Sequence, residues 1–280
     1  MNDNVPGRSM AITDEEFQLL RDLVYQRFGI HLSEQKKSLV VGRLQKDLQS
    51  SGFQTFGDYY RHLMKNPSAE AFSRLIDRIS TNYSFFYREK AHFEFFSTTL
   101  LPELVKRLRQ RNSKDMRIWC AGCSTCEEPY TLVMLMMDYF GPDYSAWDAG
   151  VLATDISERV LKVARRGVYA ADRVAQAPLA LQQRYFQQRG GEMAVKEKVN
   201  KEVVIRRFNL MNPFPFQKPF QVIFCRNVMI YFDRVTRERL IAKFHAALEP
   251  GGYLFVGHSE TVSRDSGLFT YVQPALYRKM

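Results

Sequence analysis

The stretch "RIWCAGCSTCEEPY" (residues 117–130) decides how the chain is interpreted, because it runs from an apolar strand pattern through small residues into a helical pattern. It also carries Cys120, Cys123 and Cys126, spaced three residues apart. Three interpretations are open. The stretch is a metal site that uses Cys225 as a fourth thiolate, a reactive thiol at a helix start, or a turn where the backbone approaches a ligand.

The two thiol interpretations are weakly supported by the spacing. Cys120 lies in the strand pattern, where neighbouring side chains point to opposite faces. No His accompanies the cysteines, and zinc sites usually gather their ligands in two knuckle pairs. Cys126 lies where a helix start would stabilise a thiolate, but no His nearby in the sequence could act as its base. Four cysteines in a chain of 280 residues make no disulfide framework. We therefore expect reduced thiols and no metal.

The third interpretation fits the surrounding pattern. A strand that enters a turn at Gly122 and then a helix is typical of open parallel sheets, which bind nucleotides at the carboxyl ends of their strands. The next strand, "VLATD", ends in Asp155, the position at which an acidic residue holds a ribose diol in dinucleotide-binding folds. The later segment "LEPGGYLFVG" (248–257) is common in methyltransferases that use S-adenosylmethionine.

From Arg117 onward, short apolar runs alternate with helical patterns, which predicts an α/β, Rossmann-like domain over residues 89–280. Residues 168–206 are too long for a plain connection and predict a small inserted β/α subdomain. Helices are expected at 127–140, 157–166 and 233–248. The expected strands are "RIWCA", "GVLATD", "EVVIRRF", "QVIFCRN" and "YLFVGH", with "FTYVQPALYRK" (269–279) as a closing antiparallel edge.

Residues 11–88 predict an all-helical N-terminal domain of about four helices, preceded by a flexible N-terminus at 1–10. Thr13 and Glu16 have the spacing of a capping box, and Gly29 is placed to end the first helix. Ser33 is expected to cap a second helix that continues to 48. Two shorter helices are expected at 55–65 and 69–79.

Composition narrows the class of protein. With 45% apolar residues, no apolar run near the roughly 20 residues of a membrane span and no secretory signal pattern, we expect a cytoplasmic globular protein without membrane insertion. The net charge of +10 and the motif "NPFPF" (212–216) suggest an alternative, an RNA or DNA methyltransferase. That motif precedes the fourth predicted strand, "QVIFCRN", whereas the similar loops of amino-methylating enzymes follow the fourth strand, so we expect no nucleic-acid partner.

Several longer motifs occur in a recognisable order. They are "ISTNYSFFYRE" (79–89), "AGCSTCEEPY" (121–130), "ATDIS" (153–157), "FNL" (208–210), "FCRNVMIYF" (224–232) and "FVGHSE" (255–260). From about Thr13 to the C-terminus the chain closely resembles the CheR family, bacterial methyltransferases of chemotaxis receptors. The resemblance implies that S-adenosylmethionine methylates glutamate side chains on cytoplasmic chemoreceptor helices, with S-adenosylhomocysteine as the product. Loss of Arg88 or Tyr231, the catalytic residues that the resemblance implies, would have suggested a noncatalytic binding module. Both residues are present.

The resemblance also implies the site residues. Arg88 and Tyr231 are the expected catalytic residues, because a guanidinium and a phenol hydroxyl can hold the incoming carboxylate, which needs no base at its ordinary pKa of about 4.3. The expected cofactor contacts are Asn82, Ser84, Arg88, Glu128, Asp155, Asn209, Leu210, Arg226 and Asn227. Family members generally have Gly where this chain has Cys126, which puts the backbone contacts of that turn in question.

Two expectations concern the receptor. The second helix is expected to contact it through Lys36, Lys37, Arg43 and Lys46. An ordinary solvated face is the competing interpretation. Some family members also grip a pentapeptide at the receptor's C-terminus by strand addition. The loop "QQRGGEMAVKEKVNKE" (187–202) is shorter here than in such relatives, so we expect no pentapeptide tether.

Overall fold

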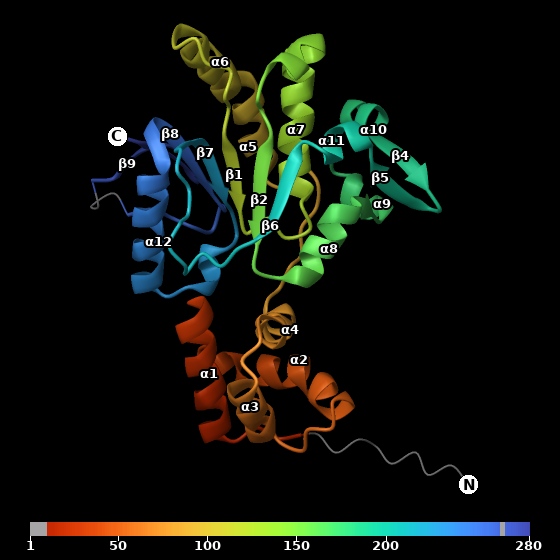
Figure 1. Cartoon of the computed structure of the whole chain (residues 1–280), viewed down its shortest axis with the longest axis vertical. Coiled ribbons are helices and arrows are strands. Elements are labelled where there is room, and N and C mark those ends of the chain that lie inside the picture. Colours follow the sequence, from red (N-terminus) through yellow and green to blue (C-terminus); the bar gives the residue numbers. More distant parts are fainter. Residues whose placement is uncertain (1–9, 264–266) are drawn as a thin grey trace. The chain divides into compact units, whose positions relative to one another are not determined.

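The computed structural model describes residues 10–263 and 267–280, so most of the predicted flexible N-terminus lies outside the described residues. The chain divides into two compact units between Thr81 and Asn82, whereas the sequence suggested a boundary at 88/89. Figure 1 shows the elements of each unit.

The first unit is helical, as the sequence predicts. Thr13 and Glu16 form the predicted capping box, and Gly29 ends the first helix with a φ of +70°. The cap predicted at Ser33 is wrong, because its side chain makes no capping hydrogen bond and a turn of 3₁₀-helix precedes the second α-helix. The elements are α1 (Asp14–Phe28), η1 (Glu34–Lys36), α2 (Lys37–Ser50), α3 (Phe56–Lys65) and α4 (Ala69–Ile79).

The second unit is built on a seven-stranded sheet of order β6-β2-β1-β7-β8-β10-β9. The strands from β6 to β8 run parallel, and β10 pairs antiparallel with β8 and with β9. The segment predicted as one closing edge is therefore a hairpin of two strands. The strands are β1 (Ile118–Ala121), β2 (Val151–Asp155), β6 (Val203–Arg207), β7 (Phe220–Cys225), β8 (Leu248–Val256), β9 (Phe269–Gln273) and β10 (Leu276–Lys279).

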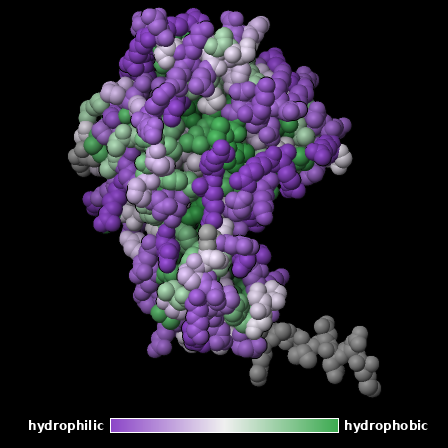
Figure 2. Space-filling view, in the orientation of Figure 1, coloured by the Kyte–Doolittle hydropathy of each residue, from purple (hydrophilic) through white to green (hydrophobic). Residues whose placement is uncertain are grey.

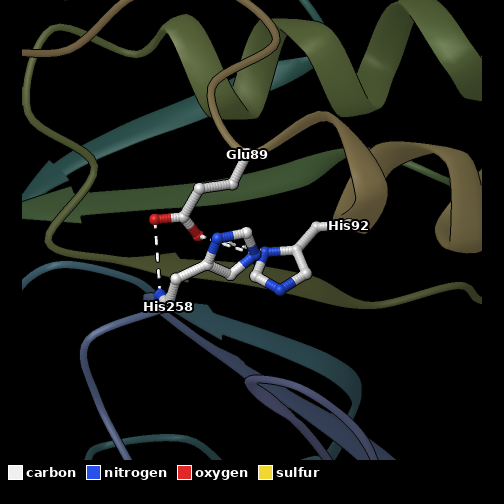
Figure 3. A group of neighbouring side chains, drawn as sticks. All are labelled: Glu89, His92 and His258. Carbon is white, nitrogen blue, oxygen red and sulfur yellow. Dashed lines mark hydrogen bonds and ion pairs between the residues drawn. The ribbon is translucent and has the colours of Figure 1, made fainter.

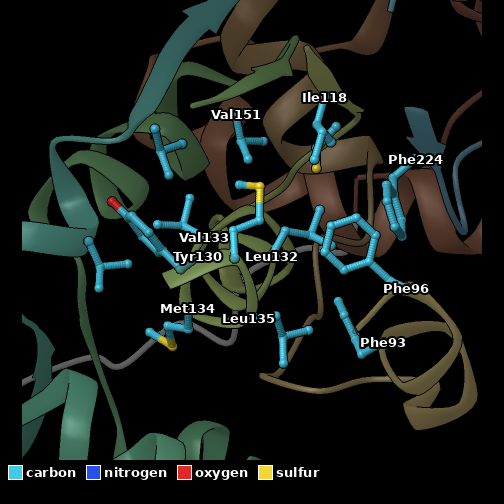
Figure 4. Close-up of a cluster of buried hydrophobic side chains, with 14 of the residues drawn as sticks. Phe93, Phe96, Ile118, Tyr130, Leu132, Val133, Met134, Leu135, Val151 and Phe224 are labelled. Atoms are coloured by element: carbon cyan, nitrogen blue, oxygen red, sulfur yellow. The ribbon is translucent and has the colours of Figure 1, made fainter. Parts of the chain in front are cut away.

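Alternate residues of the strands supply two separate cores, because successive strand side chains point to opposite faces. On one face Ile118, Val151 and Phe224 pack with residues of α5 to α8, as Figure 4 shows for part of this cluster. On the other face Trp119 packs with Phe244 of α12. The helical elements are α5 (Lys90–Phe95), η2 (Phe96–Leu100), α6 (Leu101–Gln110), α7 (Glu127–Phe140), η3 (Gly141–Ala146), α8 (Glu158–Arg166), η4 (Met229–Tyr231) and α12 (Arg234–Ala247).

The predicted insertion contains a separate three-stranded sheet of order β3-β5-β4. Its hairpin turns through Gly190 and Gly191, both with positive φ, and the main sheet resumes with β6. Figure 2 shows mainly hydrophilic residues on the visible face of the second unit, with hydrophobic residues gathered over the middle of the sheet. The elements are β3 (Val168–Tyr169), α9 (Ala171–Val174), α10 (Leu179–Tyr185), β4 (Phe186–Arg189), β5 (Glu192–Val195) and α11 (Glu197–Asn200).

Candidate active site

The loops that follow β1, β2 and β7 meet at one edge of the sheet. Ala121 lies beside Thr154 in the parallel β1–β2 pair, and Cys120 lies beside Phe224 in the parallel β1–β7 pair. Because parallel strands end on the same side, residues 122–126, Asp155 and the loop 226–231 are neighbours. This is the edge at which open α/β sheets bind their ligands.

Asp155, at the tip of β2, is fixed by backbone donors. Its carboxylate accepts hydrogen bonds from the N–H groups of Ser124 and Ser157, each at 2.9 Å, and the residue is 9% exposed. The hydroxyl of Ser124 donates to the carbonyl of Asn82 at 3.0 Å. Ser124 therefore joins the predicted ribose-binding acid to the first predicted cofactor segment, and sequence reasoning had not singled it out.

Gly122 and Cys126 shape the turn between β1 and α7. A Cβ atom on Gly122 would lie 2.3 Å from Val228 Cγ2, and its φ of +82° is left-handed, so only glycine fits. Cys126 also has a left-handed φ, +70°, which explains why glycine suits this position and adds about 1–2 kcal/mol of backbone strain to a side chain there. The register is kept, because Glu127 and Glu128 still begin α7.

The thiols of the cluster do not form a metal cradle. All four cysteines are free and buried. Among residues 10–263 and 267–280, the one group of three or more side chains close enough to share an ion is Glu89, His92 and His258, with no cysteine in it. Burial raises the pKa of the Cys123 thiol, which favours its protonated form.

Residues 82–88 begin beside the glycine turn, where Asn82 accepts a hydrogen bond from Ser124. The N–H of Phe86 donates to the carbonyl of Arg173 at 2.9 Å, and Arg88 Nη1 donates to the carbonyl of Tyr83 at 3.1 Å. Arg88 and Ser84 are both half-buried. A guanidinium has five donors, so this one bond leaves Arg88 the capacity to bind a carboxylate as well.

Arg226 is the centre of a buried charge network. Its guanidinium lies 2.8 Å from the Glu128 carboxylate and 3.1 Å from the Glu89 carboxylate, and it also donates to the carbonyl of Arg88. Burial raises the pKa of Glu128, and the charge of Arg226 opposes that rise. Burial acts in the same direction on Glu89, but there the charge of Arg226 and added hydrogen bonds prevail and its pKa is lowered. Arg226 and Glu128 thus form an ion pair with each other, and their contact with the cofactor stays a prediction.

The loop after β7 is held by Glu260, a residue that the sequence did not identify. Its carboxylate accepts hydrogen bonds from the N–H groups of Asn227 at 2.8 Å, Ile230 at 3.1 Å and Gly257 at 2.5 Å. Glu260 is 4% exposed, and Asn227 has a left-handed φ of +58°. Tyr231 follows directly in η4 and is half-buried. The carboxylate therefore fixes the backbone that carries the predicted catalytic tyrosine.

Glu89, His92 and His258 form the group drawn in Figure 3, where the two imidazoles lie against the Glu89 carboxylate. His92 Nδ1 lies 3.4 Å and His258 Nε2 lies 3.9 Å from Glu89 Oε2. The same oxygen accepts from Arg226 Nε at 3.3 Å. A metal ion there would face a guanidinium across one oxygen atom, so the charge arrangement favours an ion-pair network over a metal centre. Glu89 also accepts from Asn227 Nδ2.

Asn209 and Leu210 follow β6 at the same sheet edge. The N–H of Phe208 donates to the carbonyl of Asp155 at 2.9 Å, which brings the segment next to that acid. The Asn209 side chain accepts from the N–H of Met211, and Leu210 is 8% exposed within the α12-side core. Leu210 therefore packs as a core residue whether or not it also touches an adenine.

The motif "NPFPF" has a packing role. Phe214 and Phe216 lie edge-on against Trp119, with ring centroids 4.9 and 4.7 Å away. The motif covers one face of the sheet ahead of β7. It lies between β6 and β7 and does not follow β7, the fourth predicted strand, after which the loops of amino-methylating enzymes hold the amino group.

In the first unit, the predicted receptor-contact residues differ in exposure. Arg43 donates to the carbonyl of Ile79 and to Thr81 Oγ1, so part of its side chain secures the end of α4. Lys37 pairs with Asp14, and Lys36 is half-buried. Lys46 is exposed. The four side chains do not form one uniform stripe, and their contact with a receptor stays a prediction.

Comparison with known proteins agrees with this geometry. The family described as "CheR methyltransferase, SAM binding domain" matches residues 82–277, and "CheR methyltransferase, all-alpha domain" matches residues 15–80. The "Chemotaxis protein methyltransferase" of Borreliella burgdorferi is 42% identical over 280 residues, 99% of each chain. That of Escherichia coli is 35% identical over 273 residues, 96% of this chain and 92% of the relative.

The matches confirm the predicted family, the fold of a helical domain followed by an α/β methyltransferase domain, and the predicted cofactor. They do not favour the RNA or DNA methyltransferase. The chain therefore belongs to the CheR methyltransferase family and is a methyltransferase of chemotaxis that uses S-adenosylmethionine.

Proposed function

We propose that this enzyme methylates glutamate side chains on the cytoplasmic helices of chemoreceptors and acts in the cytoplasm. The proposal is supported mainly by the hydrogen bonds at the carboxyl end of the strands. There two N–H groups orient the Asp155 carboxylate, and Ser124 links Asp155 to Asn82. No helix in the described residues is long and apolar enough to cross a membrane.

The residues at this edge fit the donor. Asp155 would hold the ribose hydroxyls, and the Gly122 turn would let the backbone approach the rest of the molecule, because a side chain at Gly122 is excluded. Asn82, Ser84, Glu128, Asn209, Leu210, Arg226 and Asn227 are the further residues proposed around it. S-adenosylmethionine supplies a methyl group on a positively charged sulfur.

The enzyme must position the carboxylate of the acceptor glutamate next to the methyl group. A glutamate carboxylate is ionised near neutral pH, so it needs no general base, but leaving water costs it several kcal/mol unless donors replace the lost hydrogen bonds. Arg88 and Tyr231 would provide those donors, with Arg226 and Glu260 fixing the backbone on either side of them. Positioning of this kind can supply roughly 7–11 kcal/mol of the barrier reduction.

For the receptor surface, we propose that Lys46 makes the main electrostatic contact, because it is exposed, while Lys36, Lys37 and Arg43 contribute less. We further propose that no pentapeptide tether is used. The β4–β5 hairpin turns in two glycines and offers a short β4 of four residues. Calorimetric titration with a receptor C-terminal peptide tests this, and micromolar binding would refute it.

The proposed activity is tested by transfer of labelled methyl groups to receptor cytoplasmic fragments and, in parallel, to total RNA. Label is expected in a base-labile ester on the receptor fragment alone. Arg88→Ala is expected to lower kcat about 100-fold or more, since one removed charge-stabilising donor typically costs that much. Labelled RNA, or a receptor label resistant to mild base, would overturn the proposal.

A further inference from the structure

We propose that Cys123 and Cys126 are a redox-sensitive dithiol that oxidises to a disulfide and so weakens methyl-donor binding at the neighbouring turn. The Cys126 thiol donates to the Cys123 sulfur at an Sγ–Sγ distance of 3.6 Å. The other two cysteines, Cys120 and Cys225, lie on strands β1 and β7. Nothing in the established methyl transfer uses a thiol.

The turn brings the two thiols to one side. The N–H of Cys126 donates to the carbonyl of Cys123 at 2.9 Å, and Ser124 and Cys126 are both left-handed, with φ of +49° and +70°. The pair immediately precedes the 14-residue helix α7. A Cys-x-x-Cys pair at a helix start is the arrangement found in dithiol oxidoreductases. Here it arises because a cysteine occupies the left-handed position that glycine suits.

The chemistry needs an oxidant, and a peroxide suffices. A thiolate of the pair attacks hydrogen peroxide and becomes a sulfenic acid with release of hydroxide. The second thiol then displaces water from that sulfur. In sum, two thiols and one hydrogen peroxide give one disulfide and two water molecules. Burial raises the pKa of Cys123, so little thiolate is present near neutral pH and the reaction is expected to be slow and faster at alkaline pH.

The distance between the two sulfur atoms indicates how a disulfide would affect the donor site. A disulfide requires an S–S separation of about 2.05 Å, so the two sulfurs must approach from 3.6 Å, and we infer that the bond shifts the turn that joins the two residues. Ser124 lies within this turn, and it holds both the Asp155 carboxylate and the Asn82 carbonyl. This second part rests on the proposed role of Asp155 in donor binding.

The first test measures the bond. The reduced full-length enzyme is treated with hydrogen peroxide, alkylated after denaturation and digested with trypsin. Cys120, Cys123 and Cys126 fall in one peptide, residues 118–159, and Cys225 in another. The peptide is expected to lose two hydrogens and to carry one alkyl group, on Cys120. Cys225→Ser is expected to behave like the wild type, and Cys126→Gly to form no bond. A bond that persists in Cys126→Gly, or three alkylated cysteines in the wild type, would overturn the proposal.

The second test measures S-adenosylhomocysteine binding by calorimetry before and after oxidation, and again after dithiothreitol. Oxidation is expected to weaken binding about tenfold or more, reversibly, in the wild type and in Cys225→Ser but not in Cys126→Gly. Equal affinity of reduced and oxidised wild-type enzyme would overturn the link between the bond and the donor site. No binding by the reduced enzyme would instead overturn the role proposed for the site itself.

Discussion

The loop after β1 and the loop after β7 are each fixed by a buried carboxylate that accepts backbone N–H groups, but we propose different roles for the two loops. In the first, the N–H of Ser124 donates to the Asp155 carboxylate, which also accepts the N–H of Ser157 in its own loop after β2. In the second, the Glu260 carboxylate accepts those of Asn227 and Ile230. Asp155 ends strand β2 at the edge where open α/β sheets bind ligands, so we propose that this carboxylate both orients the loop and holds the donor. Glu260 fixes the loop that carries Tyr231, the residue proposed to hold the acceptor, together with Asn227, a proposed donor contact.

The comparison implies that donor binding and acceptor placement can be damaged separately, except where the loops touch. That point is Gly122, whose Cβ position lies against Val228 of the second loop. Variants at Gly122, Asp155 and Glu260 should therefore produce three different patterns of loss.

The largest effect is expected for Gly122→Ala. A methyl group there must displace Val228, which is 2.3 Å away, and adopt a φ of +82°. Together the overpacking and the strain should lower the free energy of unfolding by about 2–4 kcal/mol. Both donor affinity and kcat should fall, because both loops must shift. Urea denaturation and steady-state kinetics measure these quantities.

Gly191→Ala is the matched control, since its φ is +84° and no atom lies within 4 Å of its Cβ position. It should lose only the strain contribution, about 1–2 kcal/mol, and leave kinetics unchanged. If the two variants were equally destabilised, contact between the loops through Val228 would not be the reason for glycine at 122.

The next effect is expected for Asp155→Asn. The amide keeps one acceptor oxygen and loses the charge, so it holds Ser124, Ser157 and the donor less well. We expect S-adenosylhomocysteine to bind about 100-fold more weakly, in line with the loss of charge-assisted hydrogen bonds worth 1.5–3 kcal/mol each. Calorimetry measures this, and equal affinity would remove Asp155 from the donor site.

A smaller and different effect is expected for Glu260→Gln. The amide can no longer accept three N–H groups as a charged acceptor, so the loop 226–231 becomes less well fixed. We expect kcat to fall about tenfold and donor affinity to fall less than in Asp155→Asn, because the first loop keeps its own carboxylate and only Asn227, among the proposed donor contacts, loses a backbone hydrogen bond. Glu260→Asp should recover part of kcat.

Glu249→Gln is the control for the loss of a buried carboxylate in general. Glu249 is 7% exposed and pairs with Arg107 near the start of β8, at the other end of that strand from Glu260. It should lower stability without lowering kcat. A Glu260→Gln enzyme that lost only stability would show that Glu260 has no role in placing the acceptor side.

The contrast between the loops also explains what the sequence could predict. The position of Asp155 at a strand end and the turn at Gly122 could be predicted because each depends on local order, a strand followed by a turn or an acidic tip. Thr13 and Glu16 were recognisable for the same reason. Glu260 acts on residues 30 and 33 positions away, through the adjacency of β7 and β8, which no local pattern encodes.

Charge partners over long separations were likewise hidden. Glu89 and Arg226 are 137 positions apart in the sequence and meet only because their segments share the sheet edge. Arg43 was predicted to face a receptor from its helical spacing, but that spacing could not reveal its hydrogen bond to Thr81. The failed cap at Ser33 had a local alternative, a 3₁₀ turn, that the pattern did not distinguish.

The last prediction concerns pH and the group of Glu89, His92 and His258, which lies beside the second loop through the contacts of Glu89 with Arg226 and Asn227. Burial, with the charge of Arg226 adding to it, lowers the pKa of His92 from 6.5 to about 4. Glu89 and His258 are the other titratable groups that face it. Between pH 4 and 6.5 the unfolded chain therefore binds more protons at this position than the folded enzyme does, so stability rises with pH over this window and is lost as pH falls.

We expect the free energy of unfolding to decrease by roughly 1–3 kcal/mol from this residue as the pH falls through that window. The lowered pKa of Glu89 adds a loss of the same sign at lower pH. His92→Leu removes the imidazole from a site that is 1% exposed and flanked by Phe255, and should flatten the slope above pH 4 while leaving the Glu89 contribution. Denaturation curves at several pH values give the slope. An unchanged slope in His92→Leu would mean that His92 is not the group that titrates beside the second loop.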